Sequence, residues 1–178
     1  MNNDNQIIDT ELLISGQTVL NPETFCIDTL MDELYAFVEQ KLQSTGKSHI
    51  RLEYVKYGCV GKCFAYVDGD ALRQILCILL DNAVKFTKTG YIFFGFRFGG
   101  DNERLVIFID DTGAGIPQNK MPFIFENTNQ RDKGRSGLFT ANALVQLMGG
   151  NIEARSTNGA GSSFHVILAC KSFEVFEN

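Results

Sequence analysis

The sequence contains no tryptophan, only two histidines and three prolines, and no apolar run near the ~20 residues that a membrane-spanning helix requires. Basic residues are also scarce, since 16 lysines and arginines face 21 aspartates and glutamates, for a net charge of −5. This balance argues against a nucleic-acid binder held by phosphate contacts. The first residues lack the basic and apolar segments of an export signal, so we expect a cytoplasmic domain without membrane contact.

The five cysteines are irregularly spaced and give little support to a metal site. Cys59 and Cys63 form the one close pair, no second pair exists, and the two histidines are His49 and His165. Because a structural zinc site normally has four such ligands, the pair is at most half a site. We therefore expect reduced thiols, as is usual in the cytosol.

The chain of 178 residues, 44% of them hydrophobic, has the length and composition of one globular domain. We interpret the polar residues 1–25 as a linker or the end of a preceding helix. Residues 26–172 are expected to form the domain, and residues 173–178 a tail.

Hydrophobic periodicity predicts three long helices and about six strands. The helices are expected at residues 27–42, 70–86 and 138–148, with Asp28 or Thr29 capping the first. The strands are expected at residues 49–57, 64–68, 91–98, 104–110, 152–155 and 164–168. Glycine- and asparagine-rich turns join the last four into two hairpins. We predict an α+β fold, a two-layer sandwich with about three helices on one face of a mixed, mostly antiparallel sheet.

Two polar residues stand out on the second predicted helix. Asn82 and Lys85 lie within one turn on its flank, away from the apolar stripe. A neutral amide oxygen can bind Mg²⁺, and an ammonium group suits phosphate oxygens. The pair can therefore hold a metal–triphosphate group, although on this helix alone a solvated polar face is the simpler interpretation.

An apolar strand delivers Asp111, and Gly113 and Gly115 follow it closely. A carboxylate can accept a hydrogen bond from the 6-amino group of adenine and is unfavourable beside the 6-oxo group of guanine. Glycines allow close backbone approach. The alternatives are a simple acidic turn, or the Asp-Thr-Gly of an aspartic protease, whose second carboxylate would have to come from a homodimer.

Further glycines, Gly134 and Gly137, precede the last predicted helix, whose free N–H groups can bind phosphate. The motifs follow one another in the order Asp70–Leu76, Asp81–Thr87, Asp111–Ile116, Phe123–Glu126, Gly137-Leu138 and Met148–Gly150. In this order and spacing they resemble the catalytic ATP-binding domain of sensor histidine kinases, within the superfamily that includes gyrase and MutL. The resemblance covers about residues 24–170.

The resemblance implies a Bergerat-type ATP-binding fold, with ATP and Mg²⁺ as cofactors. It implies that Asn82 is the Mg²⁺ ligand, that Lys85 contacts phosphate and that Asp111 recognises adenine. The other residues expected to bind ATP are Phe86, Gly113, Gly115, Ile116, Gly134, Arg135, Gly137, Leu138 and Ser162. Phe125 belongs to the motif that borders the mobile lid.

The sequence departs from the family pattern at three places. Ile78 stands at a position where histidine kinases usually have an asparagine and gyrase-like ATPases have the glutamate that activates water. Because a hydrocarbon side chain cannot accept a proton, hydrolysis of the gyrase type is not expected. Only Gly137 keeps the register of the second glycine motif. The lid, residues 127–133, is short and would close poorly over a triphosphate, although Arg131, Lys133 and Arg135 can contact phosphates instead.

We therefore expect a protein histidine kinase domain that binds Mg-ATP and donates the γ-phosphoryl group to a histidine on a separate dimerisation domain. A response regulator is the expected downstream partner, and the parent protein can be membrane-anchored. Neither His49 nor His165 resembles the acceptor, so activity of the isolated chain is expected to be low. The alternatives are a degenerate module that binds nucleotide weakly and acts as a docking or regulatory surface, or an anti-sigma-type serine kinase.

Overall fold

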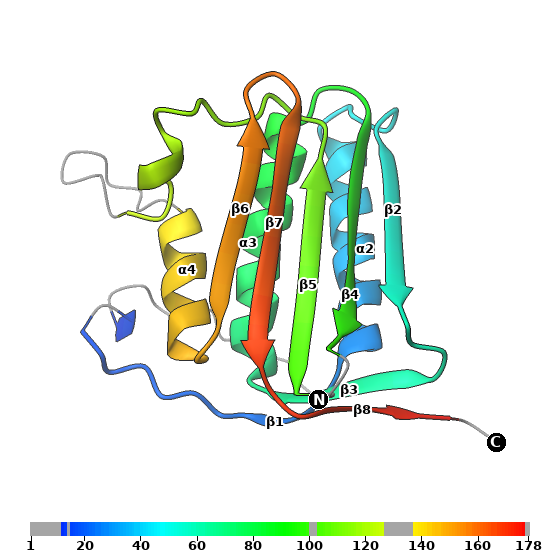
Figure 1. Cartoon of the computed structure of the whole chain (residues 1–178). Coiled ribbons are helices and arrows are strands. Elements are labelled where there is room, and N and C mark those ends of the chain that lie inside the picture. Colours follow the sequence, from blue (N-terminus) through cyan, green and yellow to red (C-terminus); the bar gives the residue numbers. More distant parts are fainter. Residues whose placement is uncertain (1–11, 14, 100–102, 127–136, 177–178) are drawn as a thin grey trace.

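Three long helices and two sheets make up the computed structural model, which describes residues 12–13, 15–99, 103–126 and 137–176 (Figure 1). The helices are α2 (Ile27–Ser44), α3 (Gly69–Phe86) and α4 (Gly137–Leu147), with a short 3₁₀ turn, η1, at Met121–Phe123. The strands are β1 (Glu23–Cys26), β2 (Arg51–Tyr57), β3 (Lys62–Val67), β4 (Tyr91–Phe98), β5 (Arg104–Asp111), β6 (Asn151–Thr157), β7 (Gly161–Ala169) and β8 (Ser172–Val175). None of the described helices is long and apolar enough to cross a lipid bilayer.

The larger sheet has the strand order β2-β4-β5-β7-β6, and the three long helices cover one of its faces (Figure 1). Strand β2 is parallel to β4, whereas the other neighbours are antiparallel. This architecture confirms the predicted α+β sandwich with a mixed, mostly antiparallel sheet. Both predicted hairpins, β4–β5 and β6–β7, are also confirmed.

A second, three-stranded sheet of order β1-β3-β8 was not predicted from the sequence. Strand β1 lies mostly in the segment expected to be a linker, and β8 lies mostly in the expected tail. Both strands are four residues long, and each pairs only with β3, far away in the sequence. Such short strands show too little periodicity to be recognised, and the expected domain limits at residues 26 and 172 cross both of them.

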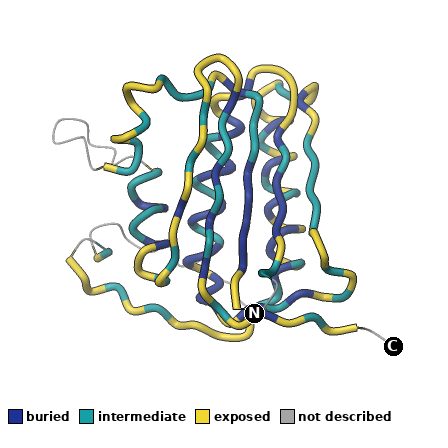
Figure 2. Tube along the Cα trace, viewed as in Figure 1, coloured by how far each residue is buried: buried dark blue, intermediate teal, exposed yellow. Residues whose placement is uncertain are grey.

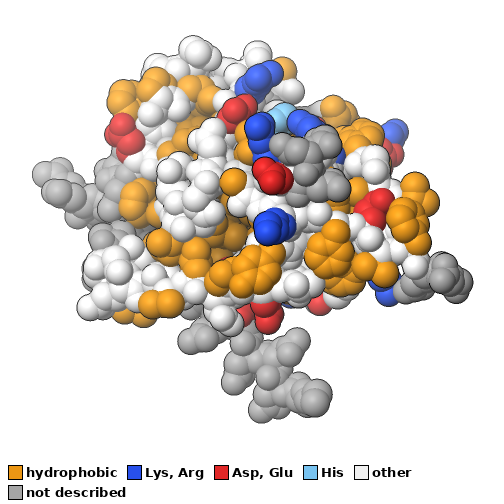
Figure 3. All heavy atoms as spheres, turned by 60° about the horizontal axis from the view of Figure 1, so that its bottom comes forward, with side chains coloured by type: hydrophobic (Ala, Val, Ile, Leu, Met, Phe, Trp, Pro, Cys, Tyr) orange, Lys and Arg blue, Asp and Glu red, His pale blue; other side chains and the backbone are white. Residues whose placement is uncertain are grey.

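The smaller sheet has one face toward the protein and one toward solvent. Cys63, Ala65 and Val67 of β3 are buried, whereas the side chains that alternate with them are less covered. On the outward face, Phe64 of β3 stacks on Phe173 of β8 with ring centroids 5.4 Å apart. Seen from this end, the molecule shows several hydrophobic side chains at its surface (Figure 3).

Burial is concentrated along β5 and on the sheet-facing sides of the helices (Figure 2). The apolar stripe of α3 is almost fully buried, as its periodicity predicts. Asp68 caps the N-terminus of α3, because its carboxylate accepts a hydrogen bond of 2.9 Å from the N–H of Ala71. The predicted cap of α2 was wrong. That helix begins at Ile27 after Cys26 without a side-chain cap, and the Asp28 carboxylate instead accepts hydrogen bonds from Lys56 and from the N–H of Cys63.

Lys47 satisfies the opposite end of α3, the end that bears Asn82 and Lys85. Its ammonium group donates hydrogen bonds to the carbonyl oxygens of Val84 (2.6 Å), Lys85 (3.2 Å) and Thr87 (2.9 Å). The last carbonyls of a helix have no partner within the helix and carry partial negative charge. Lys47 therefore links the loop after α2 to the C-terminus of α3.

Replacing Lys47 by methionine is expected to lower the free energy of unfolding by about 1–2 kcal/mol, because these carbonyls lose a charged donor. Urea denaturation followed by circular dichroism measures the change. Lys88→Met, at an exposed position nearby, is the matched control and should change stability by less than about 0.5 kcal/mol. Equal stability of the two variants would contradict the role given to Lys47.

Candidate functional site

A cavity of about 950 Å³ lies at the C-terminal end of α3 and β5. It is bounded by α3, by the loop that leads from β5 to η1, by the start of α4 and by the β6–β7 turn. The lining residues are Asn82, Lys85, Phe86, Asp111, Ala114, Gly115, Ile116, Pro117, Lys120, Phe123, Ile124, Gly137, Leu138, Asn158, Ser162 and Phe164. A volume near 1,000 Å³, mostly apolar walls and a few polar groups are typical of a ligand site.

Asp111 is the single acidic residue among the described residues that line this cavity. Its carboxylate accepts a hydrogen bond of 2.7 Å from the N–H of Gly113. Burial raises the pKa of the Asp111 carboxyl above its ordinary value, and the backbone N–H groups of Gly113 and Ser162 oppose part of this rise. The structure therefore holds a partly desolvated hydrogen-bond acceptor at the end of β5.

The position of Asp111 depends on backbones that approach too closely for any side chain. A Cβ atom at Gly161 would lie 1.9 Å from the carbonyl oxygen of Asp111, and one at Gly115 would lie 2.0 Å from that of Thr157. Both glycines also have positive φ angles, of 107° and 65°. Gly115 and Gly161 thus allow the loop after Asp111 to pack onto the β6–β7 turn.

Ser156 was missed by the sequence analysis, and it joins the two sides of this turn. Its hydroxyl oxygen accepts a hydrogen bond of 2.8 Å from the N–H of Ile116. The same hydroxyl donates to the carbonyl oxygen of Gly161 at 2.7 Å and lies 3.0 Å from the hydroxyl of Ser162. Ser156 therefore fixes Ile116 and Ser162, which both line the cavity. One serine within a strand gave no signal for this role.

The cationic groups of the cavity lie on α3 and on the loop before η1. Lys85 lines the cavity, and its ammonium nitrogen is 5.1 Å from the ring centroid of Phe86, a cation–π distance. Lys120 is a second cation in the lining that the sequence analysis did not single out. The amide of Asn82 completes the polar groups that α3 contributes. These neutral and positive groups of the lining suit an anionic ligand.

Most of the residues predicted to bind ATP therefore come together in one cavity. Asn82, Lys85, Phe86, Asp111, Gly115, Ile116, Gly137, Leu138 and Ser162 all line it. Gly113 is not in the lining and instead donates its N–H to Asp111. Gly134 and Arg135 lie outside the described residues, as does the predicted lid at 127–133. Phe125 packs against the core, whereas its neighbours Phe123 and Ile124 line the cavity.

Ile78, the apolar replacement on α3, lies directly beneath the first residue of α4. A Cβ atom at Gly137 would come within 3.0 Å of a methyl carbon of Ile78. Ile78 also packs against the hydrophobic core. Its side chain therefore supports the α3–α4 contact and offers no polar group to the cavity.

Residues 67–172 match the family of histidine kinase-, DNA gyrase B- and HSP90-like ATPases. These residues make up more than half of the chain. The chain belongs to this family. The circadian input-output histidine kinase CikA of Synechocystis sp. is 33% identical over 95% of the chain. The adaptive-response sensory kinase SasA of Synechococcus elongatus is 37% identical over 58% of it. The matches span only 23% and 28% of the lengths of these two relatives.

Solved structures show the same ATPase fold. The structure of full-length ShkA in complex with AMPPNP has a TM-score of 0.75 over 89% of this chain and 33% of that one, at 24% identity. The histidine kinase AdeS of Acinetobacter baumannii has a TM-score of 0.70 over 89% of this chain and 72% of that one, at 19% identity. The arrangement predicted from the sequence is thus the fold of histidine kinase ATPase domains.

Asp111→Asn is expected to leave the protein at least as stable as the native chain at pH 7. Because the native carboxyl holds its proton to a higher pH than the unfolded chain does, the native free energy of unfolding falls as the pH rises through this window. Asparagine removes this penalty and keeps an acceptor oxygen for Gly113. The advantage should shrink as the pH falls toward the ordinary aspartate pKa of about 3.9. Urea denaturation of both proteins across this pH range measures the difference, and a stability loss in Asp111→Asn that grows with pH would contradict the account.

Proposed function

We propose that this ATPase domain binds Mg-ATP in the cavity between α3, the Asp111 loop and α4, and donates the γ-phosphoryl group to a histidine on another domain. The observation that supports this proposal most directly is that Asp111, Asn82 and Lys85 line one cavity. Phosphoryl transfer needs positioning and charge neutralisation more than covalent chemistry from the protein. The proposal accordingly gives the domain these two tasks.

Asp111 would recognise the adenine ring. Its carboxylate is partly desolvated and held by backbone N–H groups, so its second oxygen can accept a hydrogen bond from the 6-amino group. Guanine presents an oxygen at that position and would be repelled. Ile116 and Phe164 add apolar surface to the same cavity, which suits a flat purine.

Asn82, Lys85 and Lys120 would hold the metal–triphosphate group. Magnesium takes oxygen ligands and usually keeps several waters and substrate phosphates among them, so the amide oxygen of Asn82 would be one protein ligand. When bound, Mg²⁺ would neutralise charge on the phosphates. The two lysines add positive charge to the cavity lining without competing for the metal.

The acceptor histidine would come from a dimerisation domain, and a response regulator would receive the phosphoryl group next. Both histidines of the chain are placed elsewhere in the structure. Nε2 of His49 is 2.8 Å from the carbonyl oxygen of Lys88, and His165 lies within β7. Neither of them lines the cavity. The names of the relatives CikA and SasA, both kinases, support this assignment of the transfer reaction.

Isothermal titration calorimetry with ATP and Mg²⁺ tests the binding step. The native chain should bind ATP in preference to GTP, and Asp111→Asn should bind ATP roughly 10- to 100-fold more weakly, because one hydrogen bond to a charged group is lost. The preference for ATP over GTP should shrink in the same variant.

Asp110→Asn is the matched control, because neighbouring residues of a strand point to opposite faces and Asp110 is not part of the cavity lining. It should bind ATP as the native chain does. No measurable binding by the native chain, or equal losses in both variants, would contradict the proposed function.

Ile78 favours one second candidate, a degenerate module that keeps the fold but binds nucleotide weakly and acts as a docking or regulatory surface. Its hydrocarbon side chain offers no ligand to a metal ion, and it packs against the start of α4. Equal and negligible ATP affinity of the native chain and Asp111→Asn would support that candidate. A serine kinase remains distinguishable through its product, since phosphoserine is stable in acid and phosphohistidine is not.

A further inference from the structure

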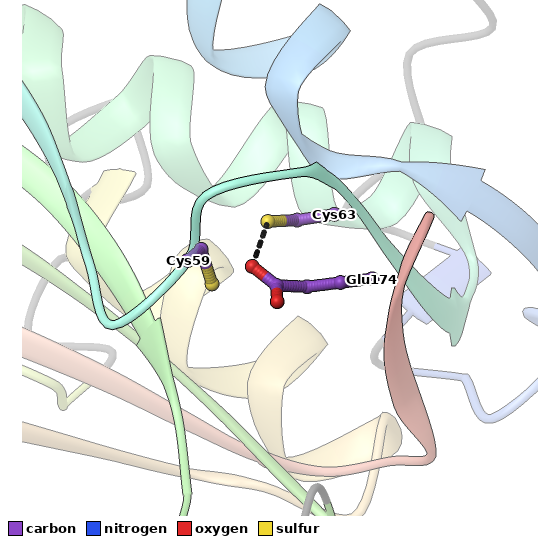
Figure 4. Close-up of side chains that lie close together, drawn as sticks. All are labelled: Cys59, Cys63 and Glu174. Atoms are coloured by element: carbon purple, nitrogen blue, oxygen red, sulfur yellow. Dashed lines mark hydrogen bonds between the residues drawn. The ribbon is translucent and has the colours of Figure 1, made fainter. Parts of the chain in front are cut away.

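A cluster of side chains of metal-ligating types lies beside the small sheet, away from the cavity. Cys59 and Cys63 flank the tip of the β2–β3 turn, and Glu174 comes from β8, 111 residues further along the chain. One ligand atom from each residue lies within 4.8 Å of the other two. Figure 4 shows the three side chains directed toward one another. None of the three lines the ATP cavity.

The register of the small sheet explains why Glu174 reaches the cysteines. Cys63 and Glu174 are direct partners in the antiparallel β3–β8 pair, so their side chains share one face. That face is the inward one, because Cys63 is buried and Glu174 is half-buried between the more exposed Phe173 and Val175. The Sγ atom of Cys63 is 3.9 Å from Oε1 of Glu174.

Close contact between the turn and β8 brings Cys59 to the same point. A Cβ atom at Gly61 would lie 2.5 Å from the carbonyl oxygen of Val175, so only glycine allows this approach. The N–H of Val60 donates a hydrogen bond of 2.7 Å to Oε1 of Glu174. The turn is thus fixed against β8 by backbone as well as side-chain contacts.

We propose that Cys59, Cys63 and Glu174 bind a zinc ion that joins the β2–β3 turn to β8. Two thiolates and a carboxylate are ligands that zinc accepts, and the fourth tetrahedral position would be left to water. Zinc–ligand bonds of about 2.3 Å to sulfur and 2.1 Å to oxygen place sulfur and oxygen about 3.6 Å apart. The distance of 3.9 Å between Sγ of Cys63 and Oε1 of Glu174 is close to this value. Sγ of Cys59 lies within 4.8 Å of the other two ligand atoms, so it would have to move by at most about 1 Å to complete the site.

The surroundings of the three ligands already contain hydrogen bonds that orient a metal site. The N–H of Cys63 donates to Asp28 at 2.6 Å, which fixes the backbone of this ligand. Lys56 donates to Asp28 and to the carbonyl oxygen of Gly61, both at 2.8 Å. Outer contacts of this kind fix the ligands of metal sites and strengthen binding. The site joins residues that are far apart in the sequence, so zinc should stabilise the folded chain.

The experiment measures zinc binding by the fully reduced chain. Equilibrium dialysis in the presence of a phosphine reductant, followed by metal analysis, should give one zinc ion per native chain. Zinc should also raise the thermal unfolding midpoint, since it binds the folded state. Cys59→Ser should bind zinc at least about tenfold more weakly, and its unfolding midpoint should respond less to zinc. Co²⁺ in place of zinc should give the visible absorption bands of a tetrahedral thiolate site.

Cys170→Ser is the matched control, because Cys170 is another half-buried cysteine outside the cluster. It should bind zinc as the native chain does. Glu174→Gln keeps the size of the side chain and an acceptor for Val60, and it should still lose at least about tenfold in zinc affinity. The proposal is overturned if the native chain binds no more zinc than Cys59→Ser, or if Glu174→Gln binds it as tightly as the native chain. ATP titration is independent of this result, since the two sites share no residue.

Discussion

The close packing of the β5 end against the β6–β7 turn is the constraint on which the candidate site depends. Gly161 sits against the carbonyl of Asp111, and Gly115 against that of Thr157, at distances that exclude a Cβ atom. This contact brings two backbone N–H groups to a carboxylate whose burial would otherwise be more costly. A half-buried acceptor of fixed direction at a strand end can select one purine edge, and no other described residue of the lining is acidic.

The residues that line the cavity were predicted from the sequence more successfully than the residues that support them, for a physical reason. Asn82 and Lys85 are placed by helical periodicity, and Asp111 by a strand that ends in a glycine turn, so local patterns suffice for these residues. The partners of Ser156 and Glu174 lie 40 or more residues away in the sequence, and the position of Lys120 depends on how its loop folds. Neither feature produces a periodic sequence pattern. The same applies to β1 and β8, which are strands only because β3 pairs with them. The cap of α2 was mispredicted because the Asp28 carboxylate accepts hydrogen bonds from Lys56 of β2 and from the N–H of Cys63 in β3 instead.

The helix α3 links the two ends of the molecule. Its N-terminus, capped by Asp68, lies near the small sheet, and its C-terminus, bound by Lys47, bears the polar residues of the cavity (Figure 1). Ile78 lies between them and packs under Gly137, which ties the position of α4 to the core of α3. The candidate cavity and the Cys59–Cys63–Glu174 cluster therefore lie at opposite ends of one continuous framework and share no residue.

A crystal structure of this chain with Mg²⁺ and a non-hydrolysable ATP analogue tests the central claim most directly. The account predicts the 6-amino nitrogen of adenine at about 3 Å from a carboxylate oxygen of Asp111, with the phosphates beside Asn82 and Lys85. A purine bound elsewhere, or phosphates remote from α3, would contradict it.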